Sequence, residues 1–380
     1  MKKTLIITLE YPPTIGGIAT YVHDLANTLD PEKTVVLAPH HAEEKSWDKD
    51  QKYKVIREKL LYPKFIWPRW LKLLRVVRKI VKQEKIELIM IQHVLPVGYA
   101  GIRMKRSKKI PFLLFSHGTD LVAGTATKWK KKMMTKVSTA AEQIVFNSES
   151  LKRRYLRVLP QFEDKSLVLY PCPNPGFLKA PAEDEIEELR TRYALQGKQV
   201  MLSISRLADG KGFPHLVRMM PEILKNAPHL VWIIVGDGPK KTLVLKEIQK
   251  HNLQNVVRFV GHMPHADLKK YYYLADLFVL LTHPDEGREE GLGLVFLEAA
   301  AAGIPVVAGR SGGVEEAVLH EKTGLVLDLQ RQAMVIPTAI GDLLKNSERA
   351  KEFGENAKAR IRSDFQWEYQ IDKLKPWITD

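Results

Sequence analysis

Two glutamates eight residues apart are the strongest candidates for chemistry in this chain. Glu290 and Glu298 enclose a run with two glycines and small apolar residues, a pattern typical of a loop that enters a helix. Their carboxylates could accept hydrogen bonds from sugar hydroxyls. The glycines let a ligand approach the backbone, and the amides of the helix start can hold a phosphate. The alternative interpretation is a helix with an acidic first turn.

A pair of cations follows a predicted strand over residues 200–205. Arg206 and Lys211 lie five residues apart in a loop that contains glycine. Such cations could bind one diphosphate and stabilise the charge that develops on a departing phosphate. The alternative is two solvated loop cations. The loop lacks the Gly-x4-Gly-Lys-Ser/Thr spacing of a P-loop, so an ATPase is not indicated.

Two further loops follow predicted strands in the first half of the chain. Gly16 and Gly17 come after the strand 4–8 and open a helix, where backbone amides could meet phosphate or sugar. A plain tight turn is the alternative, and the absence of Gly-x-Gly-x-x-Gly leaves dinucleotide binding unsupported. His117 follows the strand 112–116 and would face the edge where the strands end. A structural histidine is the alternative there.

No metal site is expected. Asp48-Lys49-Asp50 has an Asp-x-Asp spacing, but no apolar strand precedes it, and no His/Cys ligand spacing occurs elsewhere. We therefore expect neither a metal nor another cofactor.

The order of strand-like and helix-like segments predicts an α/β protein with two doubly wound parallel sheets. Short apolar runs alternate with helical patterns in both halves, and the proline-dense segment 171–176 separates them. We predict a first domain over residues 1–172 and a second over residues 173–363. Because ligands of open α/β sheets bind at the carboxyl ends of the strands, a cleft between the two domains is expected. The one cysteine, Cys172, excludes an intrachain disulfide and suits a reducing cytoplasm.

Positive charge is concentrated in one part of the sequence. Residues 65–140 carry 17 Lys and Arg against three acids, which is nearly the whole net charge of +15. Within it, residues 65–82 have apolar side chains at helical spacing and cations opposite them, as an interfacial helix would. An ordinary packed helix is the alternative. The residues predicted to meet an anionic membrane surface are Trp67, Arg69, Trp70, Lys72, Arg75 and Lys79.

Taken together, these loops resemble those of the GT-B-fold retaining glycosyltransferases of family four. Residues 10–18, 290–298 and 310–313 are similar to those of the bacterial phosphatidylinositol mannoside mannosyltransferases. The resemblance implies two Rossmann-like domains facing a central cleft, with a C-terminal helix, about 364–380, returning to the first domain.

The resemblance also implies a role for each candidate residue. Arg206 and Lys211 would bind the donor diphosphate, Glu290 the transferred sugar, and Glu298 the ribose. The remaining residues implied to bind the donor are His262 and Met263 at the base, Leu294 and Val295 at the phosphate, His117 over the sugar, and Gly16 and Gly17.

The implied reaction is transfer of mannose from GDP-mannose, with retention of configuration, to a lipid-linked or glycan acceptor at the inner face of the cell membrane. The leaving phosphate oxygen would take the acceptor proton, so the protein mainly positions and stabilises charge. Alternatives are a UDP-sugar donor, a nucleotide-sugar epimerase or a phosphorylase. A nucleic-acid-binding protein is a third class, but the chain has no recognisable reading element, so no nucleic-acid partner is expected.

Overall fold

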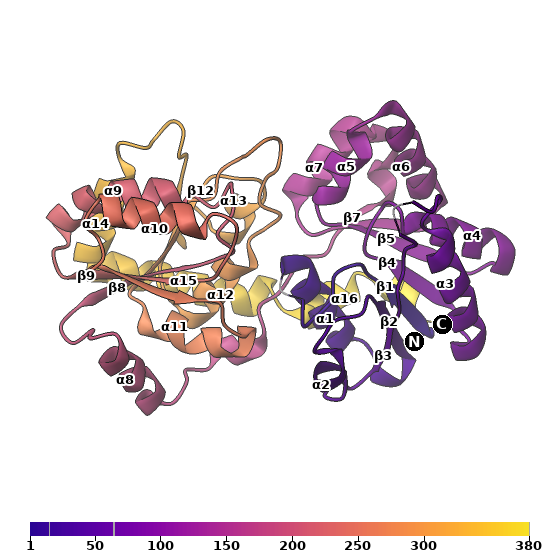
Figure 1. Ribbon diagram of the computed structural model, residues 1–380, viewed down its shortest axis with the longest axis horizontal. Coiled ribbons are helices and arrows are strands. Elements are labelled where there is room, and N and C mark those ends of the chain that lie inside the picture. Colours follow the sequence, from indigo (N-terminus) through magenta and orange to yellow (C-terminus); the bar gives the residue numbers. More distant parts are fainter. Residues whose placement is uncertain (15, 64, 380) are drawn as a thin grey trace. The chain divides into compact units, whose positions relative to one another are not determined.

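The structure is a computed structural model that describes every residue except 15, 64 and 380. The chain forms two compact units, Met1–Pro171 with Trp367–Asp380, and Cys172–Gln366. Each unit has its own parallel β-sheet with helices packed around it (Figure 1). The predicted α/β class with two doubly wound parallel sheets is therefore confirmed.

The first unit contains a seven-stranded sheet in the order β3-β2-β1-β4-β5-β6-β7. β1 lies at its centre and pairs in parallel with β2 and β4. Central strands are buried along their whole length, because helices cover both faces of a parallel sheet. The strands are β1 (Thr4–Ile7), β2 (Thr34–Ala38), β3 (Lys54–Arg57), β4 (Leu88–Ile91), β5 (Phe112–Ser116), β6 (Gln143–Phe146) and β7 (Ser166–Val168).

The end of the chain returns to this unit. The Tyr21 ring meets the Trp367 ring edge-on, with 5.5 Å between centroids, and the Lys2 amide donates to the Ile378 carbonyl at 2.8 Å. The expected C-terminal return is thus present (Figure 1). The helices of the unit are α1 (Gly17–Thr28), α2 (Glu44–Asp48), α3 (Leu71–Glu84), α4 (Gly98–Lys108), α5 (Thr119–Thr125), α6 (Lys128–Ala140), α7 (Glu149–Val158), α16 (Trp367–Asp372) and α17 (Lys375–Ile378).

The second unit contains a six-stranded sheet in the order β10-β9-β8-β11-β12-β13. The strands are β8 (Gln199–Ile204), β9 (Leu230–Val235), β10 (Val257–Gly261), β11 (Leu277–Leu280), β12 (Val306–Gly309) and β13 (Gly324–Leu327). The helices are α8 (Glu183–Arg192), α9 (Phe213–Asn226), α10 (Lys241–Lys250), α11 (Leu268–Leu274), α12 (Leu294–Ala302), α13 (Val314–Ala317), α14 (Ile336–Lys345) and α15 (Ser347–Asp364).

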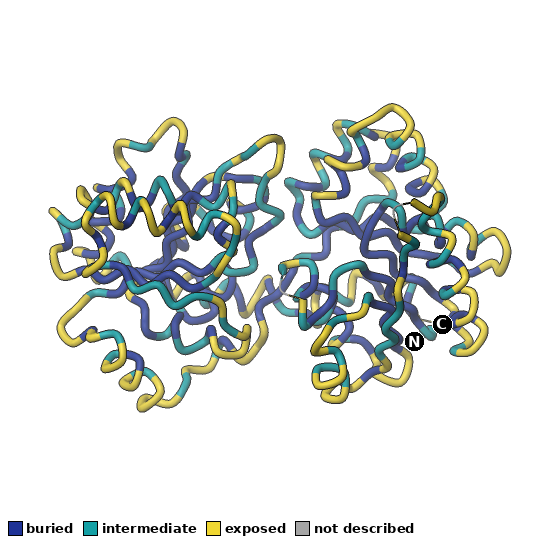
Figure 2. Tube along the Cα trace, in the orientation of Figure 1, coloured by how far each residue is buried: buried dark blue, intermediate teal, exposed yellow. Residues whose placement is uncertain are grey.

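Helix α3 corrects one prediction. Its apolar stripe, including Leu74, Val77 and Val81, is buried in the core of the first unit. This stripe was predicted to face lipid, and that interpretation was wrong because the helix must cover a face of the sheet. The most exposed apolar side chains lie instead in the preceding loop, where Phe65 is 86% and Trp67 79% exposed. The central strands of both sheets are buried, whereas the exposed residues lie mainly on the helices and loops around them (Figure 2). Among the described residues, no helix is both long and apolar enough to cross a bilayer.

A close contact between glycines fixes α12 against α15. A Cβ added to Gly354, in the middle of α15, would lie 2.0 Å from the carbonyl oxygen of Gly303 at the end of α12. The two helices approach each other this closely only because position 354 lacks a side chain.

Gly354→Ala should therefore destabilise the protein, although alanine in a helix interior normally stabilises by about 1 kcal/mol relative to glycine. We expect urea denaturation to show a loss of about 1–3 kcal/mol, as for an overpacked core. Glu355→Ala, an exposed position on the same helix, is the control and should stay within about 0.5 kcal/mol of the parent. Greater stability of Gly354→Ala would contradict the contact.

Candidate active site

The candidate residues of the second unit lie in loops at the carboxyl ends of its strands. Arg206 and Lys211 follow β8, Glu290 follows β11, and Ser311 follows β12. These three strands are neighbours in the order β8-β11-β12. Parallel strands end at the same edge of a sheet, so their loops can form one site.

Lys211 and Glu290 form an ion pair in this structure. The Lys211 Nζ lies 2.5 Å from Glu290 Oε2, and the side chains are 26% and 19% exposed. Two glycines with positive φ, Gly210 and Gly212, flank the lysine. A Cβ on Gly212 would lie 2.2 Å from the Leu281 carbonyl oxygen, so only glycine lets the loop lie against the end of β11. This packing brings together two residues that are 79 positions apart in sequence.

The loop after β12 holds the backbone of Glu290. The Glu290 amide donates to Ser311 Oγ at 3.1 Å, and the Gly313 amide donates to the Glu290 carbonyl at 3.1 Å. A Cβ on Gly312 would lie 2.0 Å from that same carbonyl. The Ser311-Gly312-Gly313 sequence therefore fixes where the Glu290 carboxylate can reach.

Arg206 is exposed and stands between two anchored neighbours. The Ser205 amide donates to the Val235 carbonyl at 3.1 Å, and the Leu207 amide donates to the Asp237 carbonyl at 3.0 Å. In the part of the chain that the structure describes, no hydrogen bond or ion pair joins Arg206 to Lys211 or Glu290. The structure thus places Arg206 at the same sheet edge without bringing it into contact with the pair.

Glu298 has a different environment from Glu290. Its side chain is only 1% exposed; its Oε1 lies 2.6 Å from His265 Nε2, and its Oε2 accepts from the Tyr272 hydroxyl at 2.7 Å. Burial, and then the nearby carboxylate, raises the pKa of Tyr272 well above its usual value. The two glutamates of the pattern therefore face different partners.

The remaining donor-site candidates of the second unit lie at the same edge. Leu294 and Val295 form the first turn of α12, after Gly293 with φ +90°. His262 is exposed and Met263 half-buried, directly after β10. Sequence reasoning missed His265, which begins the 3-10 turn His265–Asp267 and follows these two residues.

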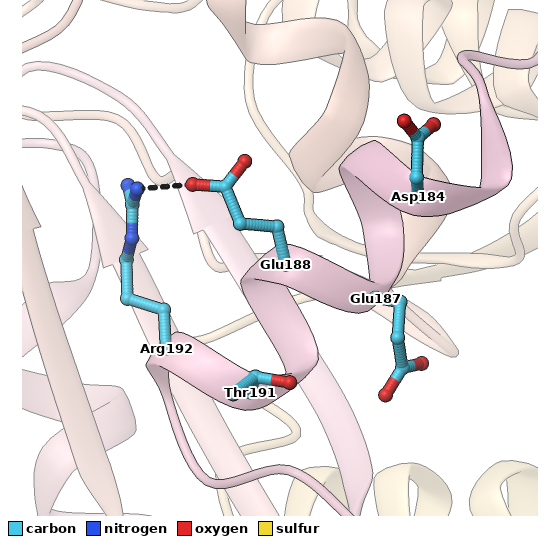
Figure 3. Close-up of a pocket in the computed structure, with 5 residues that line it drawn as sticks. All are labelled: Asp184, Glu187, Glu188, Thr191 and Arg192. Atoms are coloured by element: carbon cyan, nitrogen blue, oxygen red, sulfur yellow. Dashed lines mark hydrogen bonds and ion pairs between the residues drawn. The ribbon is translucent and has the colours of Figure 1, made fainter.

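A surface hollow on α8 does not coincide with these residues. It is lined by Asp184, Glu187, Glu188, Thr191 and Arg192 (Figure 3). All five belong to one helix, and Glu188 and Arg192 pair with each other at 2.5 Å, while Asp184 and Glu187 point away from that pair. The hollow therefore gathers no groups from separate elements and is not our candidate site.

In the first unit, His117 lies among buried polar groups at the carboxyl ends of β4 and β5. Its Nε2 is 3.0 Å from Gln92 Oε1, and its ring meets Tyr21 edge-on at 5.1 Å. Burial, and then the neighbouring His93, lowers the pKa of His117 to about 3. Burial also lowers the pKa of His93 to about 4. Both imidazoles are therefore neutral at pH 7.

Asp120 is buried beside them. Its Oδ1 accepts from the Val94 amide at 3.1 Å and its Oδ2 from the His117 amide at 3.4 Å. Burial is the largest effect and raises the pKa of Asp120 to about 7; the charge of Glu10 acts in the same direction. Gln92, His93 and Asp120 were not predicted as site residues, although Gln92 ends the predicted strand 87–92, His93 follows it, and Asp120 lies three residues after His117.

The glycine loop after β1 is anchored from β3. Gly16 has an extended backbone with φ 166°, and Gly17 begins α1. Upstream, Arg57 Nη2 donates to the Pro12 carbonyl at 2.6 Å and pairs with Asp48 at 2.7 Å. Asp48 of the Asp-x-Asp sequence is thus a partner of a buried arginine. Among the described residues, no three His, Cys, Asp or Glu side chains lie close enough together to hold a metal ion.

Comparisons with known proteins agree with this architecture. Residues 15–174 match the model of Glycosyltransferase Family 4, and residues 185–360 match that of Glycosyl transferases group 1. A GDP-mannose-dependent monoacylated alpha-(1-6)-phosphatidylinositol monomannoside mannosyltransferase from Corynebacterium glutamicum is 28% identical, over 98% of this chain and 97% of that protein. A related mannosyltransferase from Mycolicibacterium smegmatis is also 28% identical, over 96% of this chain and 94% of that protein.

Solved structures share the fold. The Anabaena protein HepE in complex with UDP-glucose superposes with a TM-score of 0.82 at 19% identity, covering 99% of this chain and 100% of that one. Sucrose-phosphate synthase from Thermosynechococcus elongatus gives 0.80 at 21% identity, covering 99% and 98%. The fold is that of the GT-B glycosyltransferases. The first unit thus contains a glycosyltransferase family 4 domain and the second a glycosyl transferases group 1 domain, and the chain is a hexosyltransferase.

The buried groups of the first unit predict a specific dependence of stability on pH. Below pH 6.5 the unfolded chain protonates His93 and His117 while the folded protein does not, so acidification destabilises the fold. Asp120 acts oppositely: between about pH 7 and 4 only the folded protein protonates it, so acidification stabilises. Each group contributes a slope of about 1.4 kcal/mol per pH unit.

As the pH falls from 6.5 to 5, the free energy of unfolding of Asp120→Asn should therefore fall by about 1.4 kcal/mol per pH unit more than that of the parent. The reason is that the variant lacks the proton uptake by folded Asp120 that offsets the effect of one histidine. The free energy of unfolding of His117→Gln should fall by about 1.4 kcal/mol per pH unit less than that of the parent over the same range. Urea denaturation at several pH values measures both slopes. Since the two changes are opposite in sign, a general loss of stability cannot imitate them, and parallel slopes in all three proteins would refute the burial effect.

Proposed function

We propose that the enzyme transfers mannose from GDP-mannose, with retention of configuration, to a lipid-linked or glycan acceptor at a membrane surface. The observation that carries this proposal is the Lys211–Glu290 pair, which places a cation and a carboxylate in contact at the edge where β8 and β11 end. A sugar diphosphate needs both groups close together. Mannose and GDP are inferred from relatives described as GDP-mannose-dependent that align over nearly the whole chain.

In this proposal the second unit binds the donor. Arg206 and Lys211 hold the diphosphate and stabilise the charge on the leaving group, so no metal or other cofactor is required. On donor binding, Glu290 exchanges its lysine contact for the hydroxyls of the sugar. The amides of Leu294 and Val295 at the start of α12 lie where helix amides favour phosphate. The backbone at His262 and Met263 receives the base.

The first unit supplies the acceptor side. His117 is neutral at pH 7 and can exchange hydrogen bonds with a sugar hydroxyl without carrying charge. Gly16 and Gly17 leave the start of α1 open to a ligand, since a Cβ on Gly17 would meet nothing within 4 Å. The leaving phosphate oxygen takes the acceptor proton, so none of these groups has to act as a base.

A UDP-sugar donor is the second candidate. The structural neighbour HepE is described in complex with UDP-glucose, and the contacts proposed for the diphosphate and the sugar would serve either nucleotide. Only contacts with the base would distinguish a GDP-sugar from a UDP-sugar.

Arg206→Ala should lower kcat for mannose transfer by about 10²–10³-fold, the usual cost of losing one group that stabilises transition-state charge. The measurement is turnover of GDP-mannose with an acceptor extract or a synthetic mannosyl lipid. In a thermal-shift screen of GDP, UDP and ADP, GDP should raise the Tm most, since a ligand that binds only the folded form stabilises it.

Arg218→Ala is the matched control, because this arginine lies on α9 in the same unit and pairs with Glu247. It should keep full activity. Full turnover by Arg206→Ala would remove that residue from the mechanism. A Tm response to UDP alone would replace the proposed donor, and no response to any of the three nucleotides would refute the proposed function.

We further propose that the first unit associates peripherally with an anionic membrane at the inner face of the cell membrane. The loop before α3 exposes Phe65, Ile66 and Trp67, and Arg75 and Lys79 are exposed on the outer face of α3, with Lys72 half-buried. Trp129, 54% exposed, lies in the first turn of the lysine-rich α6. Exposed aromatic side chains beside cations are typical of interfacial surfaces.

Three of the predicted interface residues have structural partners. The Trp70 ring packs against Tyr99 with 4.9 Å between centroids, so Trp70 supports the loop instead of entering lipid. Arg69 Nε donates to the Tyr62 carbonyl at 2.7 Å, and Arg75 Nη1 to the Tyr62 hydroxyl at 2.6 Å. Trp67 is therefore the proposed point of insertion.

The protein should sediment with vesicles that contain anionic lipid at low salt, and it should stay in the supernatant at high salt. Trp67→Ser combined with Lys79→Glu should weaken binding at least about tenfold, since each basic residue near the surface contributes about 1 kcal/mol. The control carries Lys225→Glu and Lys351→Glu, two exposed positions of the second unit. Equal binding to neutral and anionic vesicles would contradict the electrostatic part of the proposal.

A further inference from the structure

One arginine connects three segments at the carboxyl ends of strands in the first unit. Arg57 is the last residue of β3, and its side chain is only 5% exposed. Its Nη2 donates to the Pro12 carbonyl at 2.6 Å, and its Nη1 to the Pro39 carbonyl at 3.1 Å. Its Nε and Nη2 also donate to the two carboxylate oxygens of Asp48, at 3.0 Å and 2.7 Å. The guanidinium thus holds the loop after β1, the loop after β2 and the end of α2 in one arrangement.

The residue beside Pro12 is held by the same part of the chain. Tyr11 is fully buried, and its hydroxyl lies 2.6 Å from the hydroxyl of Tyr53, just before β3. The Arg57 guanidinium lies over the Tyr11 ring, 5.1 Å from its centroid. Such a contact is attractive, and more so where both groups are withdrawn from water. Tyr11 and Pro12 are therefore both fixed by residues of, or next to, β3.

The loop after β1 ends at the two glycines that the proposed function leaves open to a ligand. Gly16 has an extended backbone, and no side chain caps the start of α1. A Cβ added to Gly17 would meet nothing within 4 Å. Neither glycine has a side chain that could anchor it. Their position therefore depends on α1 on one side and on the anchored Tyr11 and Pro12 on the other.

The contacts of Arg57 require a guanidinium group. Its N–H groups point in fixed directions within one plane, so it can bind a carboxylate with two parallel hydrogen bonds and reach two carbonyls at the same time. The ammonium group of a lysine carries its three donors on one nitrogen. A lysine could pair with Asp48, but it could not also reproduce the contacts with the Pro12 and Pro39 carbonyls.

We propose that Arg57 is a positioning residue for sugar transfer, and that it determines where Gly16 and Gly17 meet the substrate. Because its side chain is almost fully buried, Arg57 acts through the loop after β1 and not by contact with the substrate. Asp48 orients the guanidinium through its two hydrogen bonds. This inference rests on the proposed function for the substrate that the loop meets.

Free guanidinium ion tests this role, since Arg57→Ala should leave a cavity of the matching shape and charge. In Arg57→Ala, kcat for transfer from GDP-mannose should fall about tenfold to a hundredfold, as for a displaced positioning group. Guanidinium chloride, far below the concentrations that unfold proteins, should restore most of this loss and should not activate the parent. The dissociation constant for GDP should stay within about twofold of the parent's, because the proposed donor site lies in the second unit.

Hydrogen exchange, followed by mass spectrometry, tests the loop without relying on activity. Peptides that cover the loop after β1 should exchange faster in Arg57→Ala than in the parent, and more slowly again with guanidinium. Peptides of β4 and β5 should exchange as in the parent. Unchanged exchange in the loop would overturn the proposal. If the parent binds none of GDP, UDP and ADP, the proposed function fails, but the exchange result still decides whether Arg57 holds the loop.

Ser138→Ala is the matched control, because it removes a buried hydroxyl of the first unit that is hydrogen-bonded to Tyr155 and lies on α6. It should lose stability in urea but keep the parent's kcat and show no response to guanidinium. An equal loss of kcat in Ser138→Ala would overturn the proposal, since loss of stability alone would then explain the effect.

Arg57→Lys keeps the proposal testable if Arg57→Ala does not fold, because the lysine retains a positive charge beside Asp48. Its kcat should still fall about tenfold, with faster exchange in the loop after β1. A kcat and loop exchange like those of the parent would show that a charge suffices at this position, and the positioning role of the guanidinium would be wrong.

Discussion

Close backbone approach at the edge of a parallel sheet is the constraint on which the candidate site depends. The Lys211 loop reaches Glu290 because Gly212 lies against the Leu281 carbonyl. Glu290 is held in place because Gly312 lies against the carbonyl of Glu290. A side chain at either glycine would push apart the loops that follow β8, β11 and β12. The Lys211–Glu290 pair requires these loops to be adjacent. The sheet supplies the edge, but the glycines decide how near the loops come.

The two units handle ionisable groups in opposite ways. In the second unit, Lys211 and Glu290 keep part of their surface in solvent and carry opposite charges, which suits exchange with a charged ligand. In the first unit, His117 and His93 are neutral because burial disfavours the charged form, and the same burial raises the pKa of Asp120. The charged groups of the second unit can neutralise a leaving diphosphate. The neutral groups of the first unit can form hydrogen bonds with hydroxyls without attracting a diphosphate.

Strands buried on both faces were predictable from sequence, because helices on each side require apolar runs such as Leu230–Val235. The edge strand Lys54–Arg57 was missed, since its residues are only partly buried and its charged ends carry no such signal. For α3, helical periodicity showed that one face is apolar but not whether core or lipid covers it. What covers the apolar face depends on the sheet on which the helix packs, and this packing is part of the tertiary structure.

The spacing of Glu290 and Glu298 was also insufficient to predict their contacts. Glu290 lies in the loop before α12 and reaches the β8 loop, whereas Glu298 lies in the second turn of the helix and faces α11 and the turn before it. The partners of Glu298 come from residues 26 and 33 positions upstream, and only the packing of α11 on α12 brings them together. A motif therefore identifies the residues of a site more reliably than it identifies what each one touches.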